Sequence, residues 1–531
     1  MIHHSTTKEC NPMNSTISLP DTSDPDPVAE VDIIIVGAGF AGVGMAVQLA
    51  RRSDQTFVVL ERADDLGGSW RDNTYPGVAC DVPSHLYSYS FAMNPDWSRQ
   101  YSPGSEIWEY IRRVAADSGI MPHVRFGHEM LAAKWDERSA RWTVATPHGN
   151  FVGRYLIAAT GHLTDPKLPP VPGIDDFGGH VMHSARWDQG VELAGKRVGV
   201  VGSGASAIQI VPSIADSVGR LIVFQRTAPY VIPRRDRAFT TAERRQFARD
   251  VASADDLRRS IFWNGDYQFA ARRRVAQYIA EAQAIAHNHL TRQVPDPELR
   301  RILTPDYEIG CKRILKSDDY YPALQRPNVT LEPSALNSVA GCTATSEAGN
   351  RYDLDVMIFA TGFETWDLPS SHVISGRRGV TLGDQWSTGM QAFNSVTVHN
   401  FPNLFMLNGP ATSLGHNSIV YMIEAQIDYI LGALHWADAN SRALPLEVDA
   451  DFEQRYADSL HEDAQHTALL AGGCSSWYVD PRNGKATLSW PNFAHTYRDD
   501  CASFDPTPYE SQAGRISGDE ALAGHGPTVV R

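Results

Sequence analysis

The stretch Asp32-Ile-Ile-Ile-Val-Gly-Ala-Gly-Phe-Ala-Gly42 decides the fold of the first part of this 531-residue chain. Four apolar residues, Ile33 to Val36, predict a buried strand, and a helix-compatible run follows the glycines. Gly37 permits a tight turn, Gly39 lets backbone N–H groups approach phosphates, and Gly42 lets the helix pack closely on the strand. The residues expected to hold a dinucleotide pyrophosphate at this helix N-terminus are Gly37, Gly39, Phe40, Ala41 and Gly42.

A second apolar strand, Thr56 to Leu60, follows and ends in Glu61. An acid at about this distance from the glycines accepts hydrogen bonds from a ribose in dinucleotide-binding folds. A glycine-rich turn in an ordinary α/β domain is the alternative interpretation. The strand, the helix and the acid together favour the nucleotide site.

Composition limits the classes of protein that remain. The chain has 62 acidic and 47 basic residues and a net charge of −15, which argues against nucleic acid or an anionic membrane as a partner. Its length predicts two or three domains. The apolar runs are strand-sized, well short of the roughly 20 residues of a membrane helix, and residues 1–30 lack the apolar core of a signal peptide. We therefore expect a cytoplasmic protein with a disordered lead-in at 1–30 and a flexible tail at 511–531.

The cysteines show neither CxxC nor metal-ligand spacing, so no metal site is expected. We interpret all of them as reduced thiols. They are Cys10, Cys80, Cys311, Cys342, Cys474 and Cys501.

A loop from Gly67 to Asp81 follows the second strand and must run beside the bound cofactor. Its candidate cofactor-binding residues are Gly68, Ser69, Trp70, Tyr75 and Asp81. From this segment alone, Trp70 as a core anchor and Asp81 as a turn cap are the favoured alternatives. Short alternating segments between 129 and 160 then predict an antiparallel meander inserted into the first domain, which returns through an apolar strand at 156–161.

A second glycine loop follows a proline-rich linker at 165–173, which predicts a domain boundary. The segment 196–207 again predicts strand, glycine loop and helix, with alanine in the permitted third position. Its candidate cofactor-binding residues are Gly202, Ser203, Gly204, Ala205, Ser206 and Ala207. The next strand ends in Arg226 and Thr227, where the first site has an acid. A guanidinium and a hydroxyl would bind a 2′-phosphate that an acid would repel, so the first site suits FAD and the second suits NADPH.

The remaining chain predicts one insertion and a return to the first domain. Residues from about 238 to 303 are helix-prone and form a helical insertion in the second domain. Lys312 and Arg313 follow, and a surface strand edge would explain both from this segment alone. Ala-Thr-Gly closes an apolar strand at 159–161 and again at 360–362, and a long apolar helix is expected from about 418 to 436. The fold class is therefore α/β with two Rossmann-like dinucleotide-binding domains, an FAD domain at 31–170 and 390–510 and an NADPH domain at 190–390.

Two long motifs resemble those of the class B flavoprotein monooxygenases, and specifically of the type I Baeyer–Villiger monooxygenases. Residues 177–188, Phe-Gly-Gly-His-Val-Met-His-Ser-Ala-Arg-Trp-Asp, match the family fingerprint FxGxxxHxxxW(P/D) at every fixed position. The loop at 67–81 fits the family's second pattern, (A/G)GxWxxxx(F/Y)P(G/M)xxxD. The resemblance covers roughly residues 31–510 and includes Cys-Lys-Arg at 311–313 and Cys-Ser-Ser-Trp at 474–477.

The resemblance implies an enzyme that uses NADPH, O2 and FAD to insert one oxygen atom beside a ketone carbonyl through an anionic C4a-peroxyflavin, giving an ester or lactone. Arg313 matches the catalytic arginine that holds this charge, and Asp81 matches the acid that positions it. Lys312 matches the lysine that joins the arginine at 226 in recognising the 2′-phosphate. Trp477 matches the tryptophan of a mobile loop over the nicotinamide nucleotide, and we expect His183 of the fingerprint to be structural.

Alternatives remain for the activity. An N- or S-oxygenating flavin monooxygenase uses a protonated hydroperoxide and does not need Arg313. A nucleotide-binding redox sensor would not turn over, and a disulfide reductase is disfavoured because no redox-active cysteine pair is expected. The identity of the ketone and the oligomeric state are not predicted.

Overall fold

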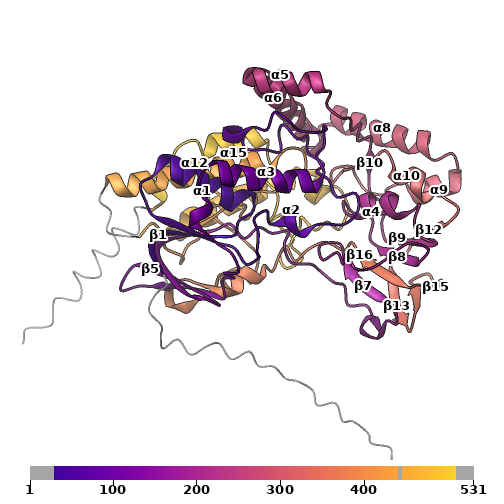
Figure 1. Ribbon diagram of the computed structural model, residues 1–531, viewed down its shortest axis with the longest axis horizontal. Coiled ribbons are helices and arrows are strands. Elements are labelled where there is room, and N and C mark those ends of the chain that lie inside the picture. The colour runs from indigo at the N-terminus through magenta and orange to yellow at the C-terminus, as the bar shows by residue number, and fades with distance from the viewer. Residues whose placement is uncertain (1–28, 441–444, 510–531) are drawn as a thin grey trace, which may run out of the picture.

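The computed structural model describes residues 29–440 and 445–509. Figure 1 shows two groups of strands side by side, each covered by helices. The predicted tail at 511–531 lies outside the described residues. So does the predicted lead-in at 1–30, except for Ala29 and Glu30, which begin the first strand.

The first sheet has eight strands, in the order β17-β4-β5-β6-β1-β2-β3, and β18 also pairs with β6. They are β1 (Ala29–Val36), β2 (Phe57–Leu60), β3 (Val124–Arg125), β4 (Ala132–Asp136), β5 (Arg141–Thr146), β6 (Gly149–Ala158), β17 (Ile374–Ser375) and β18 (Leu404–Met406). The strands β18, β6, β1, β2 and β3 are parallel to one another, whereas β5 is antiparallel to both β4 and β6.

The predicted meander differs from the structure in one respect. The segments expected as its last strand and as a separate return strand form a single strand, β6, because ten residues run without a break. Its first half pairs antiparallel with β5, and residues Phe151 to Ala158 pair parallel with β1. The meander is therefore a continuation of the nucleotide-binding sheet.

The second sheet consists of five parallel strands in the order β12-β9-β8-β16-β7. They are β7 (His180–His183), β8 (Arg197–Val201), β9 (Arg220–Phe224), β12 (Val329–Glu332) and β16 (Val356–Phe359). Two small sheets accompany it: β10 (Val231–Ile232) with β11 (Leu315–Lys316), and β13 (Leu336–Ala340), β14 (Thr343–Ser346) and β15 (Arg351–Asp353).

The helices vary from one turn to six. They are α1 (Phe40–Arg52), α2 (Ser69–Asp72), α3 (Gly104–Asp117), α4 (Ala207–Ile214), α5 (Thr241–Arg249), α6 (Val251–Tyr267), α7 (Phe269–Arg272), α8 (Ala276–Gln293), α9 (Pro297–Ile302), α10 (Tyr320–Leu324), α11 (Leu382–Gln385), α12 (Ile419–Ala439), α13 (Ala450–Gln465), α14 (Ala468–Ala471) and α15 (Ala494–Asp500). The predicted helical insertion is confirmed as α5 to α9, between β10 and β11, and α5, α6 and α8 form the upper edge of Figure 1.

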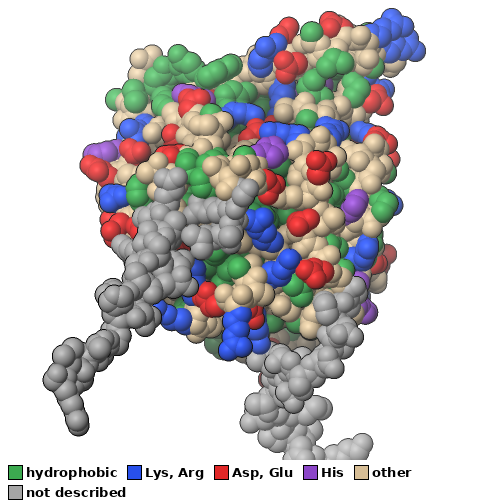
Figure 2. All heavy atoms as spheres, turned by 90° about the vertical axis from the view of Figure 1, so that its left-hand side faces the viewer, with side chains coloured by type: hydrophobic (Ala, Val, Ile, Leu, Met, Phe, Trp, Pro, Cys, Tyr) green, Lys and Arg blue, Asp and Glu red, His purple; other side chains and the backbone are tan. Residues whose placement is uncertain are grey.

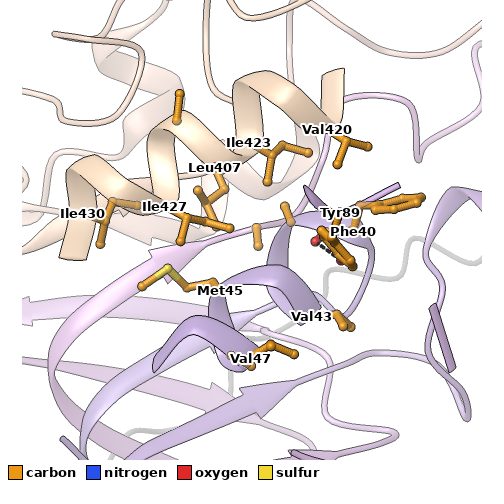
Figure 3. Packing of buried hydrophobic residues seen from close by; sticks show 14 of the residues in the cluster. Phe40, Val43, Met45, Val47, Tyr89, Leu407, Val420, Ile423, Ile427 and Ile430 are labelled. Atoms are coloured by element: carbon orange, nitrogen blue, oxygen red, sulfur yellow. Dashed lines mark hydrogen bonds between the residues drawn. The ribbon is translucent and has the colours of Figure 1, made fainter. Parts of the chain in front are cut away.

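Alternate residues of β1 point into two cores. Ile33 and Ile35 join the core that contains α1 and α12, whereas Ile34 packs in the core on the opposite face of the sheet. Figure 3 shows Met45 of α1 close to Ile427 of α12, so the helix after the first glycine loop packs against a helix nearly 400 residues later in the chain. Helix α1 thus packs against both the first sheet and α12.

The chain returns to the first sheet in two steps. β17 pairs with β4 before residue 390, and β18 then pairs with β6. The predicted long helix is confirmed as α12, whose preceding residue Ser418 accepts a hydrogen bond from the backbone N–H of Val420 at 3.3 Å. The predicted division into FAD and NADPH domains remains a prediction, with the proviso that residues 374–375 contribute to the first sheet.

The prediction that every cysteine is a free thiol is wrong. Cys311 and Cys474 form a disulfide across 163 residues of sequence, with Cα atoms 6.2 Å apart. Sequence spacing could not reveal this pair because it forms through tertiary packing. Cys80, Cys342 and Cys501 are free.

Two further surveys cover only residues 29–440 and 445–509. Over this part of the chain, no helix has the length and apolar character required to cross a membrane, and no three His, Cys, Asp or Glu side chains are grouped to hold a metal ion. On the face in Figure 2, the described basic and acidic side chains are interspersed. That face therefore presents a mixed field rather than a basic surface for a polyanion.

Candidate active site

One large cavity of about 1370 Å³ brings the two glycine loops together. Most of the predicted site residues line it: Gly37, Gly39, Phe40, Ala41, Glu61, Gly68, Ser69, Trp70, Tyr75, Asp81, Gly202, Ser203, Gly204, Ala205, Ser206, Arg226, Thr227, Lys312, Arg313 and Trp477. Gly42 and Ala207 are not among the lining residues. They occupy the third position of each glycine motif, where the helix packs on the strand.

In the first glycine loop, some glycines are required by the fold of the chain and one leaves room for a ligand. Gly37 has φ +102°, and a Cβ there would lie 2.5 Å from the carbonyl oxygen of Ala159. A Cβ at Gly42 would lie 1.8 Å from the Gly37 oxygen, so both glycines are required by the chain itself. At Gly39 a Cβ would meet nothing closer than 3.7 Å. The open space beside the N-terminus of α1 is the cradle that a pyrophosphate requires.

The second loop repeats this arrangement. Gly202 has φ +119°, and a Cβ there would lie 2.5 Å from the oxygen of Ala360. A Cβ at Gly204 would have nothing within 4 Å. The repeated Ala-Thr-Gly triplets therefore have one physical role: the backbone of the alanine in each triplet packs directly against the first glycine of the corresponding loop. Neither α1 nor α4 has a side-chain cap or an acid in its first turn, which leaves both N-termini free for an anion.

Glu61 is buried beside the first loop. Its carboxylate accepts hydrogen bonds from the backbone N–H of Ala38 at 2.8 Å and of Ala63 at 3.0 Å, and from Arg71 at 3.0 Å. The contact with Ala38 places the carboxylate at the glycine loop, as the predicted ribose contact requires. Arg71, which sequence reasoning missed, also lines the cavity.

The loop at 67–81 joins the two halves of the cavity. It contains one short helix, α2, and Trp70 donates a hydrogen bond from its indole to Tyr87 at 3.2 Å. Tyr75 donates to Gln209 of α4 at 2.9 Å, so the loop contacts the second nucleotide-binding unit directly. Asp81 follows at its end.

Asp81 and Arg313 form a two-pronged ion pair on the cavity wall. The Nε and Nη2 atoms of Arg313 each donate to one carboxylate oxygen at 2.8 Å. Lys316 adds a bond from its Nζ to the backbone oxygen of Asp81 at 3.1 Å. The strand-edge interpretation of Arg313 is wrong, because β11 begins only at Leu315 and the guanidinium is directed at a carboxylate 232 residues away.

The charges of this pair stabilise each other. Burial alone would raise the pKa of Asp81, but the nearby charge of Arg313, then that of Lys316, outweighs burial and holds the pKa below its usual value. The carboxylate of Asp81 raises the pKa of Arg313 in turn, and the nearby phenol of Tyr478 contributes. Arg313 is thus a fixed, permanently charged donor at the cavity.

Lys312 and Arg226 bring two positive charges to the cavity. Burial lowers the pKa of Lys312, and the charge of Arg226, which lines the same cavity, lowers it further. Thr227 is adjacent, and its backbone oxygen accepts a hydrogen bond from Ser203 of the glycine loop at 3.0 Å. Such a cluster suits an anion with several negative oxygens.

Trp477 lies on a second wall of the cavity. Its ring stacks on Tyr478 with 4.1 Å between ring centroids, and its backbone oxygen accepts a hydrogen bond from Trp366 at 2.8 Å. His183 is buried on β7, where its Nδ1 accepts a hydrogen bond from the backbone of Ala185 at 3.1 Å. Burial lowers the pKa of His183 to about 4, so a neutral imidazole holds this connection.

Sequence comparison decides the family. The pattern of the pyridine nucleotide-disulphide oxidoreductase family matches residues 34–236. The chain is 42% identical over 481 residues to a Baeyer-Villiger monooxygenase of Streptomyces coelicolor, which covers 90% of this chain and 92% of the relative. It is 39% identical over 504 residues to a Baeyer-Villiger monooxygenase of Pseudomonas aeruginosa, covering 93% and 94% of the two chains. The chain belongs to the Baeyer–Villiger monooxygenase family.

Solved structures agree with this assignment. Cyclohexanone monooxygenase from Rhodococcus sp. Phi1 bound to NADP+ superposes with a TM-score of 0.80 at 28% identity, covering 90% of this chain and 97% of that one. The OTEMO complex with FAD and NADP gives 0.79 at 26% identity, covering 90% and 98%. The predicted Baeyer–Villiger resemblance, the α/β fold with two dinucleotide-binding units, and the flavin monooxygenase class with FAD and NADP as cofactors are confirmed at the level of the family.

These relatives favour a monooxygenase over a disulfide reductase. A cysteine pair does exist, but neither Cys311 nor Cys474 is among the residues that line the cavity. Other residues at the site escaped sequence reasoning, chiefly Lys316, Tyr478 and Gln209. Lys316 and Tyr478 lie within three residues of predicted site residues, which is the one signal that could have indicated them.

Proposed function

We propose that this Baeyer–Villiger monooxygenase inserts one oxygen atom beside the carbonyl of a ketone, giving an ester or lactone, and that Arg313 and Asp81 are its catalytic pair. The observation that carries the proposal is the bidentate contact between them on the cavity wall. Two parallel hydrogen bonds fix both the position and the plane of the guanidinium.

The geometry leaves part of the guanidinium free to act. Asp81 accepts from Nε and Nη2, whereas Nη1 reaches the oxygen of Leu414 at 3.5 Å, at the limit for a hydrogen bond. The remaining N–H groups can donate to a negatively charged oxygen in the cavity. When bound, FAD reduced by NADPH supplies the electrons that activate O2. The contribution of Arg313 is to hold negative charge on the attacking oxygen, which an N- or S-oxygenating enzyme does not require.

The cation cluster supports NADPH as the electron donor. Lys312, Arg226 and Thr227 line the same cavity as the second glycine loop, and their charges and hydroxyl would favour a 2′-phosphate on a nucleotide bound there. Ser476 and Trp477 line the same cavity and would cover the nucleotide. The open position at Gly204 fits the pyrophosphate between them.

From the sequence and the relatives we further propose a substrate class, a location and partners for the enzyme. The ketone is a small molecule of unspecified shape, the protein is proposed to work in the cytoplasm, and its partners are NADPH and O2 rather than nucleic acid. The nonproductive redox-sensor alternative predicts no sustained NADPH consumption with a ketone. A panel of linear, cyclic and aromatic ketones, scored by a product mass increase of one oxygen, tests the substrate and the redox-sensor alternative together.

Replacement of Arg313 tests the catalytic assignment. Arg313→Ala should bind FAD and oxidise NADPH yet form no ester, with the oxygen released as hydrogen peroxide. Arg313→Lys should rescue little, because a compact ammonium cannot reproduce the two-pronged contact with Asp81. Ester, peroxide and NADPH are measured in one reaction. Ester yields equal to those of the unmodified enzyme would refute the role of Arg313 and favour an N- or S-oxygenase.

A further inference from the structure

The disulfide joins two segments that both contribute to the active-site cavity. Cys311 directly precedes Lys312 and Arg313, a stretch that we call the Arg313 segment (residues 310–313). Cys474 lies at the start of the Trp477 loop (residues 473–478), of which residues 475–478 line the cavity. One covalent bond therefore connects the proposed catalytic arginine with the wall that carries Trp477.

The Trp477 loop has few other attachments at this end. Within the described residues, the backbone of 473–475 forms no hydrogen bond. The nearest backbone contact is a bond from the N–H of Glu308 to the oxygen of Gly472 at 3.0 Å. Gly473, with φ +75° and open space around it, offers a flexible backbone just before Cys474. The disulfide is therefore the main link between the start of the loop and the Arg313 segment.

The two sulfurs differ in access. Cys311 is fully buried, whereas Cys474 is partly exposed and sits between two exposed residues, Gly473 and Ser475. A thiol or peroxide reagent can reach the pair from the Cys474 side. Neither cysteine lines the cavity, so the exchange can occur without a reagent entering the active site.

We propose that Cys311 and Cys474 form a reversible thiol–disulfide site that controls how firmly the Trp477 loop is held beside Arg313. Its oxidant is hydrogen peroxide. The Cys474 thiol attacks the O–O bond to give a sulfenic acid and one water, and the Cys311 thiol then displaces a second water to form the S–S bond. Its reductant is a dithiol, which takes up the bond by exchange and becomes a disulfide itself.

The state of the disulfide would affect turnover, and this consequence rests on the proposed function. A loosened loop retains the nicotinamide nucleotide less well and leaves the reduced cofactor exposed to solvent, so more oxygen leaves as hydrogen peroxide. That peroxide is the oxidant that restores the disulfide. Hydrogen peroxide released in unproductive turnover thus re-forms the disulfide, and the disulfide in turn limits further peroxide release.

The test compares the same holoenzyme in two states, after treatment with hydrogen peroxide or with dithiothreitol and removal of each reagent. Alkylation followed by peptide mass spectrometry reports the state of Cys311 and Cys474. NADP+ affinity is measured by calorimetry, and peroxide formed per NADPH is measured without any ketone. We expect reduction to weaken NADP+ binding about threefold or more, because the loop loses preorganisation, and to raise the peroxide fraction.

Two variants provide controls. Cys474→Ser should match the reduced enzyme in both treatments, and Cys342→Ser, at an exposed free cysteine, should respond as the unmodified chain does. Free alkylation of both cysteines after peroxide treatment overturns the proposal, and so does a disulfide that forms without changing NADP+ affinity or peroxide yield. Comparison of the two states of the unmodified enzyme does not depend on either variant folding. Because no ketone is used, failure of this proposal is distinguishable from failure of the ketone assignment.

Discussion

The substitution Asp81→Asn tests whether the ion pair, rather than Arg313 alone, is the catalytic unit. Asparagine keeps the size of the side chain but removes its charge and can accept only one of the two guanidinium bonds. Removing one preorganised donor to a developing negative charge costs about 2.7–4 kcal/mol of transition-state stabilisation. Here the side chains of Arg313 and Asp81 are 27% and 26% exposed, so solvent screens part of the interaction.

Because Arg313 itself remains, we expect a somewhat smaller loss of ~2–3 kcal/mol of transition-state stabilisation, or ~30- to 160-fold in ester formation. The loss arises because Arg313 keeps its charge but no longer has a fixed plane. FAD content should be unchanged, since Asp81 contacts neither glycine loop through a hydrogen bond in the described structure. Peroxide should rise as ester falls, with NADPH consumption maintained.

The assay follows ester, peroxide and NADPH with a ketone that the unmodified enzyme converts. The matched control is Asp355→Asn, which removes the carboxylate of a similar fork with Arg197 outside the cavity lining. Asp355→Asn should leave the ratio of ester to peroxide unchanged. The reasoning is refuted if Asp81→Asn retains ester yield within about twofold of the unmodified enzyme, or if both variants lose it equally.

Four further substitutions have outcomes that follow from the same structure. Gly39→Ala should lose FAD, and Gly204→Ala should lose NADP affinity while keeping FAD, because each new methyl group enters space that the chain leaves open for a ligand. Flavin absorbance measures the first effect and NADP+ titration measures the second. An intact flavin spectrum in Gly39→Ala would contradict the assignment of FAD to the first site. Arg226→Ala should raise the KM for NADPH several-fold to about tenfold, with little change in the KM for NADH. The rise is modest because an exposed charge-assisted contact contributes less binding energy than a buried one. Equal changes in both KM values would show that Arg226 does not contact the phosphate. Burial would raise the pKa of Asp266, but two histidine contacts and a backbone N–H hold this pKa at about 2. The contribution of Asp266 to stability is therefore present above the unfolded-state pKa near 4 and is lost as pH falls from about 4 to 2. Urea unfolding between pH 5 and 2 should show a shallower pH dependence for Asp266→Asn, and an identical slope for variant and unmodified protein would contradict this role of Asp266.

Local chemistry made the two nucleotide loops predictable from sequence. Each loop is built within about 12 residues, and its glycines are demanded by contacts with the adjacent strand ends, such as the approach of Gly37 to Ala159. The periodicity of β1 also fixes which side chains point into each core. The long helix α12 was also predictable, because the apolar residues that define it lie within one local stretch of the sequence.

Features that depend on distant pairs were not predictable from the residues alone. Nothing near Cys311 indicates that its partner is Cys474, and spacing rules for cysteines apply only to local motifs. The sequence predicts two strands where β6 is one, because the partner along one edge of β6 changes from antiparallel β5 at residues 149–153 to parallel β18 at 156–158, and the pattern of burial changes between them. Arg313 by itself fitted a surface strand edge, and only the family motif indicated its role.

The catalytic pair and the nucleotide loops differ in a way that follows from how the site is assembled. Both loops have the same backbone arrangement, so we expect their cofactor selectivity to depend on one residue after the next strand: Glu61 in the first unit and Arg226 in the second. The pair Asp81–Arg313 instead takes one residue from each side of the cavity, 232 positions apart. A change in how the two units pack would leave each loop intact but separate the two members of the pair. Cofactor binding in this enzyme can therefore survive perturbations that abolish oxygen transfer, and substitutions at the contact of Tyr75 with Gln209 should reveal this difference by lowering ester yield before they lower FAD content.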